Sequence, residues 1–455
     1  MRRDRKQMSR GRNTGLKSVL ASIPLDSWVT YGYAAVYIIL CTILLLGLLR
    51  PMPYRVFDDT VSYTGASYTI LHGIIDSART PVYPLLIAFC RAIFGEVWQC
   101  NAVVWCQSIL FVISVVCVTG ISRRLGMSRK EALLPTALYA LFPGVYQWQF
   151  VMLTEGLTIS FMVFFLWSML IGYPGVPNLK TAIWSGVWLM LLIYLRPVSI
   201  CLIPVYIIYW GWMLVKWKKT ALKSVTVAGA MLILVITTLA GYKSYIKSHY
   251  GFNSLTYVSI VNNYFTAREA MVLLPRYTDN IYFRNHLDSV SKRKPYNSRG
   301  GIADENWRPD SVDIPYSAVE KAVNHAIADH PVEVLKIMPR RALRASRLSY
   351  VYMTPKSTPD KVLQIMYRFG VYTMMIILIG TLILMLIKPA VPAVWLLWLA
   401  SASFTASCIL GAMGEWDRLT VPVLSAVIIL FCYYIVKPQF ARPPFGLGSK
   451  NRITR

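Results

Sequence analysis

Acidic residues are scarce in this chain of 455 residues. Asp and Glu together number 21, against 47 Lys and Arg, which gives a formal net charge of +26 at pH 7. The chain also lacks the phosphate-binding patterns G-x-G-x-x-G and G-x-x-x-x-G-K-[ST] and the nucleophile pattern G-x-S-x-G. Dinucleotide-binding enzymes, P-loop enzymes and serine hydrolases of the usual types therefore have no support in the sequence.

Cysteine gives no metal pattern either. The eight cysteines have no ligand spacing, and nearly all lie within or beside apolar runs. We therefore expect buried small hydrophobic side chains rather than a zinc site or a disulfide framework. The basic residues flank the apolar runs, so we expect them to contact the anionic headgroups of membrane lipids. Binding of nucleic acid is not expected.

Apolar sequence is what the chain has in quantity. Hydrophobic residues make up 56% of it, and the mean hydropathy is +0.48. Runs of about 18 to 22 residues recur, long enough to cross ~30 Å of hydrocarbon as helices. We predict an all-α polytopic membrane protein with about ten transmembrane helices. The predicted spans are 31–50, 99–120, 131–147, 151–172, 180–196, 198–215, 222–242, 365–387, 391–412 and 418–436.

The orientation of these spans follows from Lys and Arg in the short loops. Cytoplasmic loops carry the excess of these residues, and ten crossings place "SRRLGMSRK", "VKWKKTALK" and both basic tails on one side. We therefore expect a multi-pass protein of the plasma membrane with both termini cytoplasmic and an uncleaved first anchor. Segment 81–95 has only ~15 residues and contains Arg91, so it is predicted to be a short dip into the membrane or an interfacial helix.

Five regions are predicted. Two segments are predicted on the outer side, the first outer loop and a mixed extracytoplasmic subdomain, and in the subdomain the stretch 318–352 predicts two helices broken at His330-Pro331. Val319, Val323 and Ile327 would share the buried face of the first of these helices. The regions are a basic tail (1–30), a transmembrane bundle (31–242) with a first outer loop (51–98), the subdomain (243–362), C-terminal transmembrane helices (363–436) and a second basic tail (437–455).

Several ionisable residues share the predicted outer surface. Charged groups at membrane depth are costly and usually mark a site. One of these residues, Arg196, has a structural alternative to a role in a site: it could pair with Glu155 or extend toward the membrane surface. The residues are Asp58 and Asp59 in the first outer loop, Glu155 at the start of the fourth span, Arg196 at the end of the fifth, and Asp417 and Arg418 at the tenth.

The order of short motifs resembles a known superfamily. D-x-x-x-Y is followed by a basic residue before "P-x-Y-P-L-L-x-A", then "R-R-L-G", "T-E-G-L", "L-R-P" and an Arg before "L-T-V-P-V". This order is similar to that of the GT-C glycosyltransferases that use polyprenyl-phosphate sugars, which include lipid A aminoarabinose transferases and protein O-mannosyltransferases. The likeness covers residues 50–215, 315–350 and 410–430.

The resemblance implies a sugar transfer with an acidic residue of the first outer loop as catalyst. Asp59 matches that residue by its spacing to Tyr63, and Asp58 lies beside it. Arg79 matches the basic residue that binds the donor phosphate. Many relatives have Asp-Glu where this chain has Asp-Asp, and the loop from Lys243 shows no family motif.

The residue chemistry fits an inverting transfer. A hydroxyl acceptor needs a base, whereas a phosphate leaving group needs positive charge and no proton. One of Asp58 and Asp59 would be the base, and the other would bind a divalent cation or a hydrogen-bond donor. Arg79, Arg196 or Arg418 would hold the phosphate. Further candidates for the site are Tyr63, His72 and Glu155.

The location predicts a lipid-linked donor. Nucleotide sugars are cytoplasmic, and the cytoplasmic loops are too short for a nucleotide-binding domain of ~100 residues. The expected partners are a polyprenyl-phosphate-linked sugar and an acceptor that is a lipid, a polysaccharide or a protein. One alternative is a transporter of lipid-linked sugars. Another is a polysaccharide polymerase or ligase, for which the outer loop offers Arg276, Arg284, His286 and His325.

Overall fold

The computed structural model describes residues 28–49, 56, 58–291, 309, 313–345, 358–387, 390–412 and 416–436. Within these ranges the regular secondary structure is helical, without strands. The chain is an all-α polytopic membrane protein, as predicted. Its α-helices are α2 (Trp28–Leu48), α3 (Asp58–Leu71), α4 (Val82–Arg124), α5 (Arg129–Leu141), α6 (Pro143–Tyr146), α7 (Thr154–Leu170), α8 (Leu179–Leu195), α9 (Leu202–Trp217), α10 (Leu222–Tyr250), α11 (Tyr257–Glu269), α12 (Ile281–Ser291), α13 (Tyr316–Asp329), α14 (Pro331–Lys336), α15 (Met338–Ala345), α16 (Thr358–Ile387), α17 (Pro392–Gly411), α18 (Trp416–Thr420) and α19 (Leu424–Val436).

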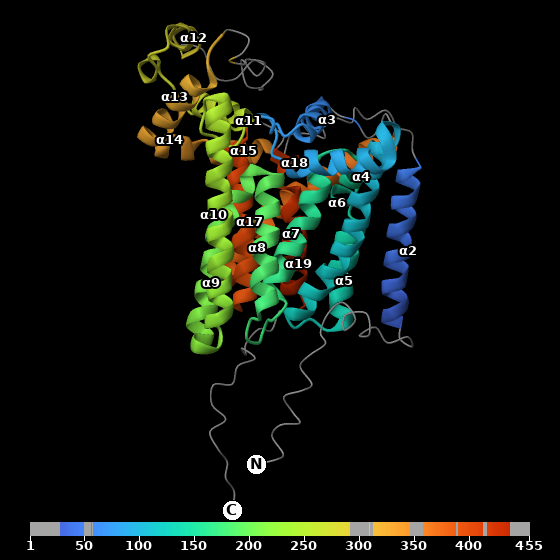
Figure 1. Ribbon diagram of the computed structural model, residues 1–455. Coiled ribbons are helices and arrows are strands. Elements are labelled where there is room, and N and C mark those ends of the chain that lie inside the picture. Colours follow the sequence, from blue (N-terminus) through green and yellow to red (C-terminus); the bar gives the residue numbers. More distant parts are fainter. Residues whose placement is uncertain are drawn as a thin grey trace, which may run out of the picture.

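Long apolar helices form a bundle whose members run roughly side by side (Figure 1). Six stretches are long and apolar enough to cross a membrane, and three shorter apolar helices accompany them among the described residues. The six are Val29–Leu48, Val82–Arg124, Pro197–Thr220, Leu222–Tyr250, Pro392–Gly411 and Arg418–Val436; the three are Thr154–Leu170, Leu179–Leu195 and Thr373–Ile387.

The predicted span at 131–147 does not form a single helix. α5 ends at Leu141, the backbone of Phe142 after it is extended (φ −73°, ψ 119°), and α6 starts afresh at Pro143. Proline has no backbone N–H and pushes the preceding residue out of the helical region, so the apolar run is divided at this point.

α4 consists of two helices joined at Gly95. The backbone of Gly95 has φ 75° and ψ 171°, a conformation that only glycine adopts without strain. The first part lies across one end of the bundle, and the second part continues through it (Figure 1). The short helix predicted at 81–95 is therefore separate from the span that was predicted to begin near residue 99.

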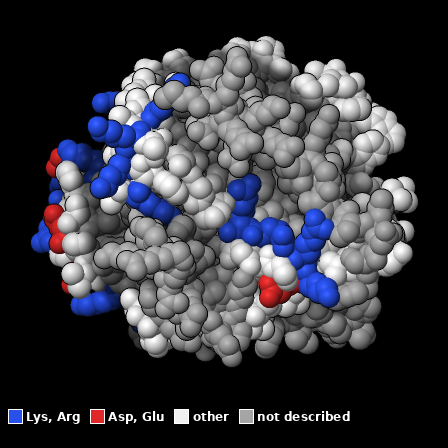
Figure 2. Space-filling view, turned by 90° about the horizontal axis from the view of Figure 1, so that it is seen from below, with Lys and Arg blue, Asp and Glu red and all other residues white. Residues whose placement is uncertain are grey.

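The two ends of the bundle differ in character. One end, called here the site end, carries α3 and α18 and faces the helices α11 to α15 (Figure 1). The other, called here the basic end, carries Arg123 and Arg124 at the end of α4, Lys216 in the last turn of α9, and Lys218 and Lys219 after α9. Figure 2 shows the basic end from below, where blue Lys and Arg side chains predominate over red acidic ones.

Helices α11 to α14 pack into a separate hydrophobic core outside the bundle. Val319 and Val323 of α13 are fully buried in it, and Ile327 packs against it. His330, with φ −129° and ψ 51°, breaks the chain between α13 and α14. The predicted break and buried face are thus confirmed, although three helices follow residue 315 rather than two, and the described part of this subdomain is helical rather than mixed.

A buried arginine connects this subdomain to the bundle. Arg341 of α15 is fully buried and donates from Nε to Glu269 of α11 at 2.7 Å. Its Nη1 donates to the carbonyl oxygens of Ile409, Leu410 and Ala412 at 2.8–3.0 Å, at the C-terminal end of α17. These carbonyls lack partners inside their helix, and a cation is favourable there. Arg341 therefore fixes the subdomain to the end of α17, close in sequence to α18.

Candidate active site

α3 begins at the two adjacent aspartates and turns one of them toward the centre of the site end. Asp59, Ser62 and Tyr63 are spaced three and four residues apart, so they lie on one face of the helix. Thr60 is buried and donates from Oγ1 to the carbonyl of Met152 at 3.0 Å, which ties the first turn of α3 to the chain before α7. The side chain of Asp58 lies outside what the structure describes.

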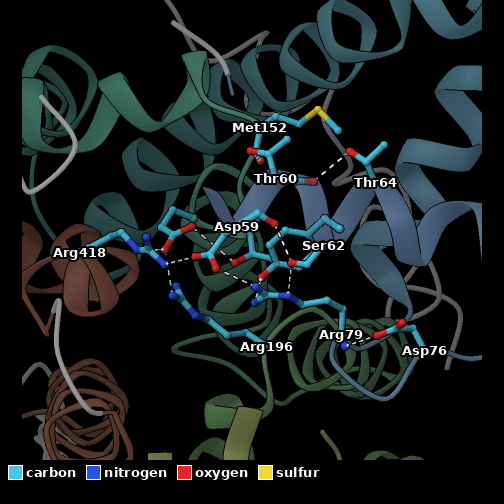
Figure 3. A network of polar contacts seen from close by, with 12 residues as sticks. Asp59, Thr60, Ser62, Thr64, Asp76, Arg79, Met152, Arg196 and Arg418 are labelled. Carbon is cyan, nitrogen blue, oxygen red and sulfur yellow. Dashed lines mark hydrogen bonds and ion pairs between the residues drawn. The ribbon is translucent and has the colours of Figure 1, made fainter. Parts of the chain in front are cut away.

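Arg79 approaches this face of α3 from the turn that precedes α4. Its Nη2 donates to Oδ1 of Asp59 at 2.7 Å, and its Nε donates to Ser62 Oγ at 2.8 Å. Its Nη1 reaches the hydroxyl of Tyr63 at 3.2 Å, and Cζ lies 4.3 Å from the Tyr63 ring centroid. The guanidinium group is thus held by three neighbours from a single helical face. Figure 3 shows two of them, Asp59 and Ser62, beside Arg79.

The second carboxylate oxygen of Asp59 accepts a hydrogen bond from a second arginine. Arg418 of α18 donates from Nη2 to Oδ2 of Asp59 at 3.0 Å, and its Nε lies 2.7 Å from Oε1 of Glu155. Arg196, at the C-terminal end of α8, donates from Nη2 to the same oxygen of Glu155 at 2.9 Å. The predicted pairing of Arg196 with Glu155 is therefore present, and Figure 3 shows Arg196 beside Arg79 and Arg418.

The cluster formed by Asp59, Arg79, Glu155, Arg196 and Arg418, called here the arginine cluster, contains one more positive charge than negative. Glu155 is 1% exposed, and the side chains of Arg196 and Arg418 are largely buried. Arg196 Nη1 is buried and has no hydrogen-bond partner among the described residues. A buried excess cation with an unused donor is unfavourable unless an anion accompanies it. The cluster is therefore suited to binding an anion.

The environment of Asp59 decides its protonation state. Burial alone would raise the pKa of its carboxyl, but the charges of Arg79 and Arg418 and their hydrogen bonds outweigh burial and hold the pKa below its usual value. Asp59 is consequently ionised at neutral pH. It is also a weak proton acceptor for as long as both arginines contact it.

The remaining candidate residues are placed differently. Tyr63 is buried and contacts Arg79, as described above. His72 is exposed just beyond the C-terminal end of α3, roughly 20 Å along the helix from Asp59, and its Nδ1 is 2.9 Å from the carbonyl oxygen of Tyr68. Among the side chains that the structure describes, no group of three or more His, Cys, Asp and Glu could hold a metal ion.

Two residues of the site were not among the predicted ones. Ser62 accepts a hydrogen bond from Arg79, and Asp76 accepts hydrogen bonds from the backbone N–H groups of Ala78 and Arg79 at 2.6 and 3.2 Å. Asp76 therefore shapes the turn that carries Arg79. A signal for both was available, because Ser62 follows Asp59 by three residues and an Asp before a turn often binds the backbone two residues on.

Comparisons with known proteins bear on this region. Residues 78–240 match the family described as dolichyl-phosphate-mannose-protein mannosyltransferase. This range includes Arg79, Glu155 and Arg196 but neither Asp59 nor Arg418. A search among curated proteins found no match.

One solved structure is similar over most of its length. It is the crystal structure of ArnT from Cupriavidus metallidurans bound to undecaprenyl phosphate, with 11% sequence identity, a TM-score of 0.34, and coverage of 86% of this chain and 77% of that one. The family match over residues 78–240 supports membership of the GT-C superfamily of membrane glycosyltransferases, which the order of sequence motifs predicts.

Proposed function

We propose that this protein is an inverting glycosyltransferase that moves a sugar from a polyprenyl-phosphate donor to an acceptor on the extracytoplasmic side of the membrane. The arginine cluster is the observation that carries the proposal. Its excess guanidinium group lies at the end of the membrane bundle, where the phosphate of a lipid would lie. The family described as dolichyl-phosphate-mannose-protein mannosyltransferase takes a donor of this class.

In the proposed reaction the acceptor hydroxyl attacks the anomeric carbon of the donor sugar. Asp59 takes the proton of that hydroxyl while the bond between the sugar and the phosphate oxygen breaks. The phosphate leaves with its negative charge, and Arg79, Arg196 and Arg418 stabilise that charge. The isoprenoid chain of the donor would lie among the apolar helices. The acceptor is a lipid, a polysaccharide or a protein.

The ion pairs of Asp59 give the donor a second role in this proposal. Arg79 and Arg418 occupy both carboxylate oxygens, so the carboxylate is blocked as a base when it is paired with them. The donor phosphate, a diester with one negative charge, competes for the same guanidinium groups. Binding of the donor would then loosen the ion pairs and make Asp59 a better proton acceptor.

The position of the charged groups favours transfer over transport. The arginine cluster is built from helix ends and the turn before α4, all at the site end. A transporter would place its substrate site near the middle of the bilayer, between broken helices. The alternative of a lipid-linked-sugar transporter therefore has less support than a glycosyltransferase.

A divalent cation at Asp58 and Asp59 stays a prediction. A cation at Asp59 would have to displace Arg79 or Arg418 from one of the carboxylate oxygens, since both oxygens already accept hydrogen bonds. Hard cations also take six or more oxygen ligands. Any cation bound here would therefore need further ligands from the donor phosphate, from Asp58 or from water.

Asp59→Asn tests the assignment of the base. The change keeps the shape of the side chain and removes its charge, so we expect sugar transfer to fall by about 10²-fold or more. Binding of the donor lipid should persist, because the three arginines stay in place. Transfer from synthetic polyprenyl-phosphate sugars, measured by mass spectrometry on protein purified in lipid, gives the first quantity, and titration of polyprenyl phosphate gives the second.

The matched control is Asp288→Asn, which neutralises an exposed aspartate of α12 outside the arginine cluster. This variant should transfer sugar like the wild type. If Asp59→Asn transferred at the wild-type rate, Asp59 would not be the base. Loss of transfer in Asp58→Asn alone would assign the role to Asp58 instead.

A further inference from the structure

A pocket lined mostly by residues with polar side chains lies in the subdomain outside the bundle. It has a volume of about 410 Å³ and opens between the turn at residues 275–280 and one face of α13. Cavities of a few hundred Å³ are of the size that binds small molecules. The pocket is lined by Arg276, Tyr277, Thr278, Asp279, Asn280, Ala318, Lys321 and His325.

Hydrogen bonds fix the wall that the turn provides. The hydroxyl of Tyr277 lies 3.1 Å from Nε2 of His330, at the break between α13 and α14. Arg276 donates from Nη2 to the same hydroxyl at 3.2 Å, and its Cζ lies 5.1 Å from the centroid of the Tyr277 ring. Asn280 accepts a hydrogen bond from the N–H of Phe283 at the start of α12. The turn is therefore held in place before any ligand arrives.

The opposite wall is one face of α13. Ala318, Lys321 and His325 are spaced by three and four residues, so their side chains follow one another along the helix. The other face of α13 is packed into the subdomain core, with Val319 and Val323 fully buried. Both walls of the pocket thus belong to a single packed unit.

The charges of the pocket are unevenly balanced. Arg276 and Lys321 are exposed, and neither forms an ion pair with a carboxylate in the described part of the chain. The acidic lining residue Asp279 lies 3.8 Å from Arg284, which is not part of the lining. The lining therefore holds two cations and one carboxylate, an excess of one positive charge, which favours an anionic ligand.

The structure also separates the four residues that the sequence offered for a polymerase or ligase. Arg276 and His325 meet at the pocket. Arg284 donates to the carbonyl of Thr278, and His286 lies 2.8 Å from the hydroxyl of the buried Tyr264. The last two contacts stabilise the subdomain, whereas Arg276 and His325 face a potential ligand.

We infer that this pocket binds an anionic saccharide, that is, a sugar ring that carries a carboxylate or a phosphate group. Arg276 and Lys321 would bind the charged group. The lining amide and hydroxyl groups would bind sugar hydroxyls, and the Tyr277 ring would pack against the apolar face of the sugar. The assignment of this saccharide to the acceptor, rather than to a separate ligand, rests on the proposed glycosyltransferase function.

Calorimetric titration of the full-length protein in lipid nanodiscs tests the inference. The probes are a uronic-acid disaccharide, a hexose 6-phosphate and the neutral disaccharide of the same size. We expect at least one anionic probe to bind about tenfold or more tightly than the neutral one, and Arg276→Ala and Lys321→Ala each to raise its Kd by about tenfold or more. The preference between the two anionic probes distinguishes a carboxylate from a phosphate.

Lys336→Ala is the control, because Lys336 is an exposed cation of the same subdomain, 3.8 Å from Glu333 and outside the pocket. It should leave the Kd unchanged. Failure of both anionic probes to bind the wild type, or equal binding by wild type and the two pocket variants, would overturn the inference. Polyprenyl phosphate titrated into the same samples reports on the arginine cluster separately, so a failure of the donor proposal would not be confused with a failure here.

Discussion

Glu155 shows how few residues hold the arginine cluster together. One of its carboxylate oxygens serves both Arg196 and Arg418, which come from helices far apart in the sequence. Because Glu155 is almost fully buried, these ion pairs are poorly screened by solvent. Arg418 is in addition the bridge from Glu155 to Asp59. The position of each guanidinium group therefore depends on the others, and their effects should not be additive.

Arg79 is the arginine whose role can be separated from the rest, because it contacts Asp59 but not Glu155. If it binds the donor phosphate, Arg79→Ala should cost about 2 to 4 kcal/mol of transition-state stabilisation. Arg79→Lys should lose less, since it keeps the charge but not the planar fork. The measurement is donor turnover per molecule of monodisperse protein.

Lys247→Ala controls for the loss of an exposed cation elsewhere, near the end of α10. A purely structural arginine at position 79 would lower the yield of folded protein and leave turnover per molecule intact. Full turnover in Arg79→Ala, with loss in Arg196→Ala or Arg418→Ala, would move the phosphate to the ends of α8 and α18.

At the scale of single elements, the backbone conformation of Gly95 sets how the segment next to Arg79 meets the membrane-crossing part of α4. It joins the short helix 82–94, which follows Arg79 directly, to the membrane-crossing part of α4. No atom lies within 4 Å of the position that a Cβ would occupy, so a side chain there meets no steric clash with its neighbours. The cost of a substitution arises from the positive φ of 75° alone.

Gly95→Ala should therefore destabilise the protein by about 1 to 2 kcal/mol through backbone strain. The change in stability is measured by heating the protein in detergent and following the loss of monodisperse protein. Gly229→Ala in α10 is the control, because that glycine is helical and also has open space around it. An unchanged transition in Gly95→Ala would mean that the two parts of α4 can align as one continuous helix.

The helices show which features of the fold sequence patterns predict and which they do not. Long apolar runs predict most helices because hydrocarbon forces backbone groups to bond within the helix. The division of the run at Phe142 could have been read from Pro143, but its apolar length concealed it. The motif order also pointed to Asp59 and Arg79 as a pair.

Apart from the pair of Arg196 with Glu155, the pairing of charged residues across the fold lies beyond such patterns. Arg418 and Asp59 are 359 residues apart, and the charge of each says nothing about its partner. The same holds for Arg341, which reads in sequence as one of several basic residues yet is fully buried against Glu269. Tertiary packing alone decides which of many arginines becomes buried, because each of them could equally have been solvated at a helix end.

At the scale of the whole molecule, orientation in the membrane decides which donors can reach the arginine cluster. The basic end and the site end lie at opposite ends of the bundle (Figure 1). Cytoplasmic loops carry the excess of Lys and Arg, so the basic end is expected inside and the site end outside. Tags inserted after residue 125, after residue 217 and at the C-terminus should then be cytoplasmic, and a tag within 290–300 should be extracytoplasmic.

Accessibility of these tags to a membrane-impermeant reagent in intact cells, compared with permeabilised cells, checks this orientation. Labelling of the 290–300 tag in intact cells, with the other three protected, would place Asp59 and the three arginines on the side that nucleotide sugars do not reach. A lipid-linked donor is then required, because its sugar is already outside. Protection of the 290–300 tag would instead place the arginine cluster in the cytoplasm. The location argument for a polyprenyl-phosphate donor would then fail, even if Asp59 and Arg79 proved essential for transfer.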